Sequence, residues 1–305
     1  MENINALFTD TDITNKLILQ ATDLCHSFGK IKAVDHLNLK ITEGEIYGFL
    51  GLNGAGKTTT IQMILGVLGV DFGTIELFGE VNKRTTVKQK QQIGFVSQEQ
   101  NIYPWMTAEV AGKFVKGLYP NWDQEEYVRL LEVFGIPFKQ KFSTFSGGMK
   151  MKLAFALAVA PRPKILILDE PTAGMDPVAR REFLQIIKRQ SKKSACTVFF
   201  SSHLLDEVEF IADTVGIIHK GKMKFEGNLD LLQQRVRRVR GDQHFRIPEG
   251  FELWHKDLAD ESDEKSFYYT LGADPEHWDS SGLDGKILTL NDIFIDCVSL
   301  STMDV

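Results

Sequence analysis

One short segment controls the interpretation of the whole sequence: Gly51-Leu52-Asn53-Gly54-Ala55-Gly56-Lys57-Thr58-Thr59. It fits the spacing G-x-x-x-x-G-K-[ST], in which glycines turn backbone N–H groups toward phosphate. The apolar run 46–50 before it predicts a buried strand, and the apolar spacing of 60–65 after it predicts a helix. A glycine-rich turn before a helix can be only a turn, but this strand–loop–helix setting favours a phosphate-binding loop. Lys57 would then contact the β- and γ-phosphates, and the Thr58 hydroxyl would bind Mg²⁺.

A second predicted strand ends in two adjacent carboxylates. The apolar run 165–168 precedes Asp169 and Glu170. At the end of a strand the chain curls, so both side chains can face a phosphate bound at a parallel neighbour. Asp169 would hold Mg²⁺ through water, and Glu170 would polarise the attacking water as general base. Without a phosphate loop, a solvated strand end would be the better interpretation.

Composition indicates an ordinary globular protein. The 305 residues are 43% hydrophobic and 25% charged, and no apolar run approaches the roughly 18 residues that span a bilayer. Residues 1–14 are polar and acidic, so we do not expect a signal peptide. Cys25, Cys196 and Cys297 lie far apart, which suits free thiols in a reducing cytoplasm.

Charge is divided unevenly along the chain. Residues 241–305 contain 15 acidic and 4 basic residues, whereas residues 1–240 carry a net charge of +5 and the whole chain −6. The shift places a boundary near 228–242. The overall balance argues against nucleic acid as the main partner, and the slightly basic larger part is compatible with an acidic membrane face.

The predicted elements alternate in a way that indicates an α/β fold. After antiparallel strands in 17–41, the chain contains these predicted elements: the strand 46–50, the strand 74–78, a solvated helix in 83–92, the strand 93–96, the strand 164–168, the helix 178–190, the strand 197–201, the helix 204–211, the strand 214–218 and a hairpin around 220–222. Between 101 and 160 the pattern is helical, with Asp123 as N-cap of the helix 124–134. We therefore expect a P-loop NTPase core with an antiparallel β subdomain and an inserted helical subdomain at about 99–160.

Further motifs follow one another in a recognisable order: Phe28, Gln98, Phe145-Ser146-Gly147-Gly148-Met149, Ala173-Gly174-Met175-Asp176 and His203. Together with the phosphate loop and Glu170, they make residues 17–227 resemble the ATP-binding cassette family, the nucleotide-binding subunits of ABC transporters. In this resemblance 145–149 is the signature motif, 173–176 the D-loop, and Gln98 the Q-loop.

The resemblance implies an ATPase made of two cassettes paired head to tail. Each ATP would lie between one subunit's phosphate loop and the other's signature helix, where Ser146 and the amides of Gly147 and Gly148 would bind the γ-phosphate. His203 would hold the attacking water. The implied nucleotide-binding residues are Phe28, Gly51, Leu52, Asn53, Gly54, Ala55, Gly56, Lys57, Thr58, Thr59, Gln98, Ser146, Gly147, Gly148 and Asp176. The implied metal ligands are Thr58, Gln98 and Asp169, and the implied catalytic residues are Lys57, Gln98, Glu170 and His203.

Each of these residues also has a plainer interpretation. Ser146 could be an ordinary helix N-cap, His203 a surface histidine, and Phe28 a core residue rather than a ring that stacks on adenine. Two positions depart from the family pattern: Phe145 and Met149 stand where leucine and glutamine are usual. The serine and glycines that reach phosphate are nevertheless present, so the departures do not exclude activity.

A narrower likeness links the chain to bacterial cassettes that are separate polypeptides, the acetoin-utilisation and bacitracin-exporter group. It rests on 119–123, 145–150 and 171–180. The resemblance implies a subunit at the inner face of the cell membrane, which powers a membrane-spanning chain. Tyr103, Trp105 and Met106 are candidate contacts to that partner, with packing inside the helical subdomain as the alternative. A soluble ATPase that acts in assembly or regulation without a membrane partner is the competing function.

The two ends of the chain match no motif. Residues 1–16 suggest a loose N-terminal arm. In 228–305 the sequence predicts a helix over 228–240 that carries several arginines, strand character in 245–247 and 286–290, and a last helix starting at 291–295. We expect a small α+β accessory domain, which either aids dimerisation or regulation or packs as a simple tail.

Overall fold

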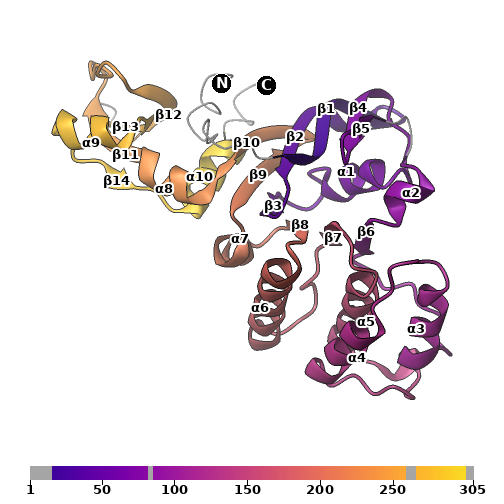
Figure 1. Cartoon of the computed structure of the whole chain (residues 1–305). Coiled ribbons are helices and arrows are strands. Elements are labelled where there is room, and N and C mark those ends of the chain that lie inside the picture. Colours follow the sequence, from indigo (N-terminus) through magenta and orange to yellow (C-terminus); the bar gives the residue numbers. More distant parts are fainter. Residues whose placement is uncertain (1–15, 82–84, 259–265, 300–305) are drawn as a thin grey trace.

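A six-stranded sheet forms the centre of the computed structural model, which describes residues 16–81, 85–258 and 266–299 (Figure 1). The strand order is β10-β9-β3-β8-β7-β6, and the strands are β3 (Ile46–Leu50), β6 (Ile93–Val96), β7 (Ile165–Asp169), β8 (Thr197–Ser202), β9 (Thr214–His219) and β10 (Lys222–Asn228). All neighbours pair in parallel except β10, which pairs antiparallel with β9. Every residue of β3, β7 and β8 is buried, as expected for a parallel sheet covered on both faces.

The register of this sheet brings several motif ends to one edge. Leu50 at the end of β3 pairs with Ser202 of β8, and Asp169 at the end of β7 pairs with Ser201. β6 runs parallel beside β7. Because the carboxyl ends of parallel strands share an edge, the segments after β3, β6, β7 and β8 emerge side by side.

A second, antiparallel sheet packs with α1 (Lys57–Ile64) against the central one. Its order is β2-β1-β4-β5, with β1 (Leu17–Phe28), β2 (Ile31–Thr42), β4 (Phe72–Leu77) and β5 (Glu80–Val81). Leu37 and Leu39 of β2 share a buried cluster with Ile61 of α1 and Ile167 of β7. The helix that begins at the phosphate loop is thus held between the two sheets.

The remaining helices of the larger part are α2 (Val87–Lys90), α3 (Ala108–Lys116), α4 (Gln124–Val133), α5 (Gly147–Val159), α6 (Pro177–Ser194) and α7 (Leu205–Ile211), with a 3₁₀ turn at Phe142–Thr144. In Figure 1, α3, α4 and α5 lie together at the lower right. The Asp123 side chain accepts hydrogen bonds from Glu125 N and Glu126 N, which confirms it as the N-cap of α4. The predicted P-loop NTPase core, with its antiparallel sheet and helical insertion, is confirmed.

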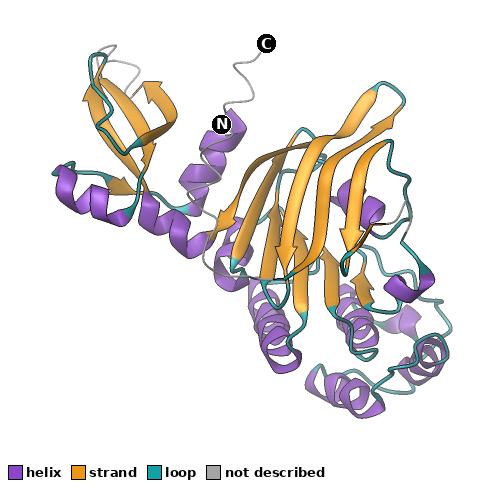
Figure 2. Cartoon of the chain, turned by 45° about the horizontal axis from the view of Figure 1, so that its top comes forward, coloured by secondary structure: helices purple, strands orange, loops and turns teal. Residues whose placement is uncertain are grey.

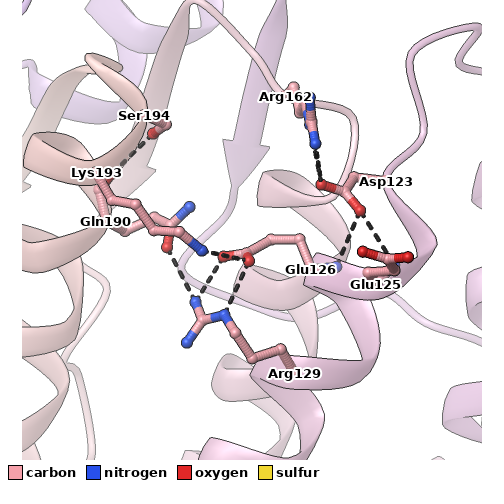
Figure 3. A network of polar contacts seen from close by, with 8 residues as sticks. All are labelled: Asp123, Glu125, Glu126, Arg129, Arg162, Gln190, Lys193 and Ser194. Atoms are coloured by element: carbon pink, nitrogen blue, oxygen red, sulfur yellow. Dashed lines mark hydrogen bonds and ion pairs between the residues drawn. The ribbon is translucent and has the colours of Figure 1, made fainter.

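An ion pair joins α4 to α6, and a second one joins the start of α4 to the segment after α5 (Figure 3). Glu126 on α4 accepts hydrogen bonds from Arg129 and, at 2.8 Å, from Lys193 of α6. The Arg129 hydrogen bond is the main cause that lowers the pKa of Glu126 to about 2. Arg162 and Asp123 form a second pair at 2.7 Å. The helical insertion is therefore tied electrostatically to the core on the side away from the central sheet's motif edge.

The C-terminal elements form a third sheet, which Figure 2 shows as a separate group of strands. Its order is β12-β13-β11-β14, with β11 (Val236–Asp242), β12 (Glu252–Leu258), β13 (Ser266–Gly272) and β14 (Lys286–Ile287), accompanied by α8 (Leu229–Arg235), α9 (Pro275–Ser281) and α10 (Leu290–Ser299). Val239, Tyr269, Leu271 and Trp278 form its own small core. α10 contacts β9 and α7, and its Ile293 belongs to the main core.

The predicted helix over 228–240 is wrong beyond Arg235, where β11 begins. Val236 and Val239 are three residues apart, a spacing that suits a helix face. In the structure Arg237 lies over the Trp278 ring, at 5.0 Å from its centroid, while Arg238 pairs with Asp296 of α10. Partners far along the chain therefore override the local pattern.

Other terminal predictions need smaller corrections. Residues 245–247 are not a strand, and within 286–290 only β14 is extended, because α10 starts at Leu290. β12 and β13 were missed, although the aromatic and β-branched composition of β13 is typical of strands. The helix expected over 83–92 is limited to α2, and residues 1–15 of the expected arm, like 82–84, lie outside the described residues.

Candidate active site

A cavity of about 470 Å³ lies at the motif edge of the central sheet. It is lined by predicted site residues from four separate segments: Asn53, Gly54, Gly56, Lys57, Thr58, Thr59, Gln98, Glu170 and His203. These segments follow β3, β6, β7 and β8, so the register of the parallel strands explains their meeting. The structure therefore brings the phosphate loop, Gln98, Glu170 and His203 together around one cavity, as the sequence predicted.

The phosphate loop depends on glycine at two positions. At Gly51 an added Cβ would lie 2.6 Å from Ile218 O, and at Gly56 it would lie 2.4 Å from Ala33 O. Gly56 is also the N-cap of α1 with φ of 111°, a conformation that L side chains rarely adopt. The loop backbone can therefore pass close to its neighbours and present the start of α1 to the cavity.

Lys57, the first residue of α1, is only 4% exposed. Its Nζ donates hydrogen bonds to Gly51 O at 2.8 Å and Leu52 O at 3.3 Å, and lies 3.2 Å from Glu170 Oε1. The ammonium group thus has protein partners at the floor of the cavity. A phosphate that binds here competes with a carboxylate for the same cation.

Glu170 lies between Lys57 and His203. Its Oε2 is 3.1 Å from His203 Nδ1, and its backbone N–H donates to Ser201 Oγ at 2.9 Å. The backbone of Glu170 has φ of 47°, the left-handed region that few non-glycine residues occupy. Such strain tends to occur at functional sites, where the surrounding structure imposes it. Here the strained residue, Glu170, also places its carboxylate in the lining of the cavity.

The other predicted residues take different positions. Gly51, Leu52 and Ala55 belong to the loop but do not line the cavity. Asp169 is 2% exposed and accepts a hydrogen bond from Ser201 Oγ at 2.6 Å. Ser146, Gly147, Gly148 and Asp176 lie away from this cavity, near the chain's surface. Phe28 is 52% exposed, so its interpretation as a core residue is wrong.

The structure places further residues around the cavity that motif reasoning did not assign to the site: Ala33, Thr172, Ala173, Gly174, Arg180, Ser202, Leu204 and Glu207. Ala173 and Gly174 were noted as part of the D-loop, and Thr172 and Ser202 flank assigned residues. Glu207 carries no local signal, because a glutamate in a short helix is usually exposed. Its proximity results from α7 folding back beside β8.

The signature glycines contrast with those of the phosphate loop. A Cβ added at Gly147 would meet nothing within 4 Å, and one at Gly148 would meet only Met175 Cγ at 4.0 Å. Ser146 Oγ accepts a hydrogen bond from Met149 N, which confirms it as the N-cap of α5. The packing of this chain alone therefore gives no reason for glycine at these two positions.

The helical insertion exposes an aromatic pair after Gln98. Tyr103 is 63% exposed and Trp105 60% exposed, and their rings stack with centroids 6.0 Å apart. Met106 is 7% exposed, so it is not a surface contact candidate and packs within the insertion. The two aromatic rings present an apolar patch to solvent.

One group of potential metal ligands occurs elsewhere in the described residues: Cys25, Asp35 and His36. The Asp35 carboxylate is already paired with Lys32 at 3.1 Å and with Lys222 at 3.3 Å. The Lys32 hydrogen bond is the main cause that lowers the pKa of Asp35. The group is better described as a surface ion-pair cluster than as a metal site.

Comparison with known proteins agrees with this geometry. A family profile described as ABC transporter matches residues 34–173. The chain is 40% identical over 227 residues to the bacitracin transport ATP-binding protein of Bacillus licheniformis. This alignment covers 72% of this chain and 73% of that protein. It is also 40% identical over 211 residues to the linearmycin resistance ATP-binding protein of Bacillus subtilis. This alignment covers 68% of this chain and 68% of that protein. The chain belongs to the ABC transporter family.

Solved structures support the same assignment. An ATP-binding subunit of an ABC transporter superposes with a TM-score of 0.64 at 28% identity, over 71% of this chain and 92% of that one. A dimeric ATP-binding cassette bound to ADP and phosphate, 22% identical, has the same fold with a TM-score of 0.63, over 69% of this chain and 98% of that one. This member of the family is an ATP-binding subunit and an ATPase. In the part that the structure describes, no helix is both long and apolar enough to cross a membrane.

Proposed function

We propose that this ATPase powers a transporter whose membrane-spanning subunit is a separate chain, which it binds at the cytoplasmic face of the membrane. The observation that carries the proposal is the meeting of Lys57, Glu170 and His203 in one cavity at the edge of the parallel sheet. A cation, a carboxylate and an imidazole in contact are the groups needed to bind a triphosphate and activate water.

The Lys57–Glu170 pair suggests how binding prepares hydrolysis. Phosphate oxygens compete with Glu170 for the Lys57 ammonium group, and the carboxylate then loses its cationic partner. Glu170 would accept a proton from water while the water oxygen attacks the γ-phosphorus and the bond to the β-phosphate oxygen breaks. ADP and inorganic phosphate are the products. His203, 3.1 Å from Glu170, would hold the water and the γ-phosphate.

The oxygen ligands near the cavity fit Mg²⁺. Thr58 offers a hydroxyl, Gln98 an amide oxygen and Asp169 a carboxylate, all hard donors of the kind that this ion prefers. Asp169 lies beneath the cavity lining, which suits contact through water. When bound, the ion would neutralise negative charge on the β- and γ-phosphates.

A second cassette would complete the site. Ser146, Gly147 and Gly148 lie at the start of the 13-residue α5, and no contact among the described residues requires glycine there. We therefore assign the exposed helix start to the γ-phosphate of the partner's ATP. Asp176, the exposed N-cap of α6, would lie in the same interface, and the half-exposed Phe28 would stack on adenine.

The exposed pair Tyr103 and Trp105 is our candidate contact to the membrane-spanning partner. Stacked aromatic rings at the surface of the helical insertion are typical of protein contact sites. The insertion follows Gln98 directly, so a partner bound there would sense the nucleotide site. The roles of the relatives in bacitracin transport and linearmycin resistance make antibiotics the first class of cargo to test.

A pull-down from detergent-solubilised membranes tests the partner. The tagged chain should retain a multi-span membrane protein in stoichiometric amount, and Trp105→Ala should reduce its recovery at least about tenfold. Phe72→Ala is the matched control, because Phe72 is an equally exposed aromatic residue, at 59%, on β4. A soluble partner that is indifferent to Trp105→Ala would support the assembly function instead.

Ser146→Arg tests the arrangement of the two cassettes. The arginine side chain should block pairing across the nucleotide and abolish ATPase activity, while the isolated chain keeps its ATP affinity. Mixing Ser146→Arg with Lys57→Ala chains should restore activity at one of the two sites at most. Full activity of Ser146→Arg alone contradicts the proposed pairing.

A further inference from the structure

A buried carboxylate connects the two loops that carry Glu170 and His203. Glu207 lies on α7 and is 2% exposed. Its Oε1 accepts a hydrogen bond from Thr172 Oγ1, and its Oε2 accepts one from Ser202 Oγ at 2.6 Å. Thr172 follows Glu170 by two residues, and Ser202 directly precedes His203. A single side chain thus contacts both loops.

The two serines at the end of β8 have different partners. Ser201 Oγ accepts the backbone N–H of Glu170 at 2.9 Å. Ser202 Oγ donates to Glu207 and accepts the backbone N–H of Leu204 at 2.9 Å. Successive side chains of a strand point to opposite faces. The Ser201 side chain accordingly contacts Asp169 and Glu170 at the end of β7, whereas the Ser202 side chain contacts Glu207 of α7.

Arg180 extends the connection to the D-loop. Its Nε lies 3.4 Å from Glu207 Oε1, and its terminal nitrogen donates to Met175 O at 3.4 Å. The cation also compensates for the burial of a carboxylate, which would otherwise be costly. The cavity-lining loop 172–175 is therefore fastened at both of its ends.

We infer that Glu207 is a positioning residue for ATP hydrolysis, which fixes the separation between the loop after Glu170 and the loop that ends in His203. This inference rests on the proposed roles of Glu170 and His203. Glu207 has its contacts with these loops rather than with the phosphate loop, so its removal should slow the chemical step and leave ATP affinity nearly unchanged. A misplacement of about 1 Å can cost ~10²-fold in rate.

The first test compares kcat, KM and the dissociation constant for ATP in single variants of the full-length chain. Glu207→Ala should lower kcat by ~10- to 100-fold, with the dissociation constant within about threefold of wild type. Glu207→Gln keeps two polar atoms in place and should recover part of the rate. Glu209→Ala is the matched control, since Glu209 is an exposed glutamate on the same helix whose carboxylate accepts from Leu290 N.

Thr172→Val keeps the test valid should Glu207→Ala fold poorly. It replaces one hydroxyl donor by a methyl group of similar shape and should lower kcat by a smaller factor than Glu207→Ala. An unchanged kcat in both Glu207→Gln and Thr172→Val would overturn the inference. A raised KM with unchanged kcat would also overturn it, because that pattern reports lost binding.

A double-mutant cycle separates positioning from general destabilisation. In a His203→Ala background, Glu207→Ala should cost much less than it does alone, because the group that it positions is already absent. If the fold loss of kcat in the double variant equals the product of the two single losses, the two residues act independently, and the inference is contradicted. If His203→Ala and Glu170→Gln themselves leave turnover normal, the proposed function fails. If these two variants lower turnover strongly while the Glu207 and Thr172 variants keep the wild-type kcat, only the positioning role fails.

Discussion

Charged side chains serve different purposes in the nucleotide cavity and in the C-terminal sheet. In the cavity, Lys57, Glu170 and His203 meet at a solvent-filled space, and a ligand can replace one partner by another. In the C-terminal sheet, Arg238 is bound by both oxygens of Asp296, and Arg237 covers the Trp278 ring.

The difference shows that residue type alone does not identify a binding site. Four arginines between 235 and 240 resemble a basic patch in the sequence, yet their contacts hold the C-terminal sheet and helices together: Arg235 also pairs with Asp274 at 3.4 Å. The cavity contains fewer cations, but its one buried lysine has partners that a phosphate can displace. A charged side chain can bind a ligand only where the ligand can displace the group with which the side chain is paired in the folded chain.

The largest effect is expected for Lys57→Ala. It removes the phosphate-binding charge and leaves the buried Glu170 without its cation, next to incoming phosphates. ATP affinity should fall ~10³-fold or more. Titration with a fluorescent ATP analogue measures this, with Arg237→Met as the control that removes a C-terminal cation. Unchanged ATP binding in Lys57→Ala would refute the assignment of the loop.

Arg238→Met tests the opposite side of the comparison. It should leave Asp296, 5% exposed, with only the Thr270 hydroxyl as a donor, and lower the free energy of unfolding of this part by about 3 kcal/mol. Chemical denaturation followed by fluorescence in a background where Trp278 is the one tryptophan kept measures it. ATP affinity should stay within about twofold of wild type. A large loss of ATP affinity in Arg238→Met would show that the ion pairs of the C-terminal sheet also influence the nucleotide cavity.

Glu170→Gln should keep ATP binding and slow hydrolysis by ~10²-fold or more, because an amide cannot accept the proton of the attacking water. Single-turnover assays and gel filtration with ATP follow the rate and the trapped dimer. The amide also removes the ion pair with Lys57, so ATP affinity should not decrease. Normal turnover in this variant would exclude Glu170 as the base.

Glu226 sharpens the comparison, because it is a buried carboxylate that forms no ion pair with any residue in the described part of the chain. Burial is the main cause that raises its pKa to about 7, while hydrogen bonds from Lys40 N and Tyr47 Oη act in the opposite direction. In the unfolded chain this pKa returns to its ordinary value of 4.5, so the folded chain binds more protons between pH 4.5 and 7. The associated stability is complete below pH 4.5 and is lost as pH rises through 7.

Thermal and urea unfolding at pH 6 and pH 8 check this. The wild type should lose about 1 kcal/mol more stability between these pH values than Glu226→Gln, which cannot ionise. Glu80→Gln, at an exposed position on β5, should follow the wild type. Equal losses in wild type and Glu226→Gln would show that Glu226 does not titrate in this range.

The sequence predicted the central sheet and most of the cavity because that information is local. Each motif directly follows a strand, and parallel pairing then brings the strand ends together. Glu207 could not be found in this way, since its contacts with Thr172 and Ser202 depend on how α7 folds back. The sequence left Met106 open between a surface contact and packing for the same reason: its burial is decided by contacts within the insertion.

The C-terminal part was predicted least well, and its stabilising contacts are long-range. β11 was predicted as part of a helix over 228–240, but its conformation is set by pairing with β13 and by Asp296, 58 positions after Arg238. The neighbouring last helix was predicted correctly, since Asp292 accepts from Thr289 N and marks its start locally. Local signals were reliable where the partner lies within a few residues.

The open surroundings of Gly147 have a consequence for protein engineering. Alanine is a better helix former than glycine, and a Cβ here would meet no atom of the described residues within 4 Å. A thermostability screen of the isolated subunit would therefore favour replacement of this glycine. In the proposed pairing of two cassettes, the penalty would appear only when the two subunits close on ATP. Selecting this protein for heat resistance as a monomer thus risks producing a more robust polypeptide that no longer works in its assembly.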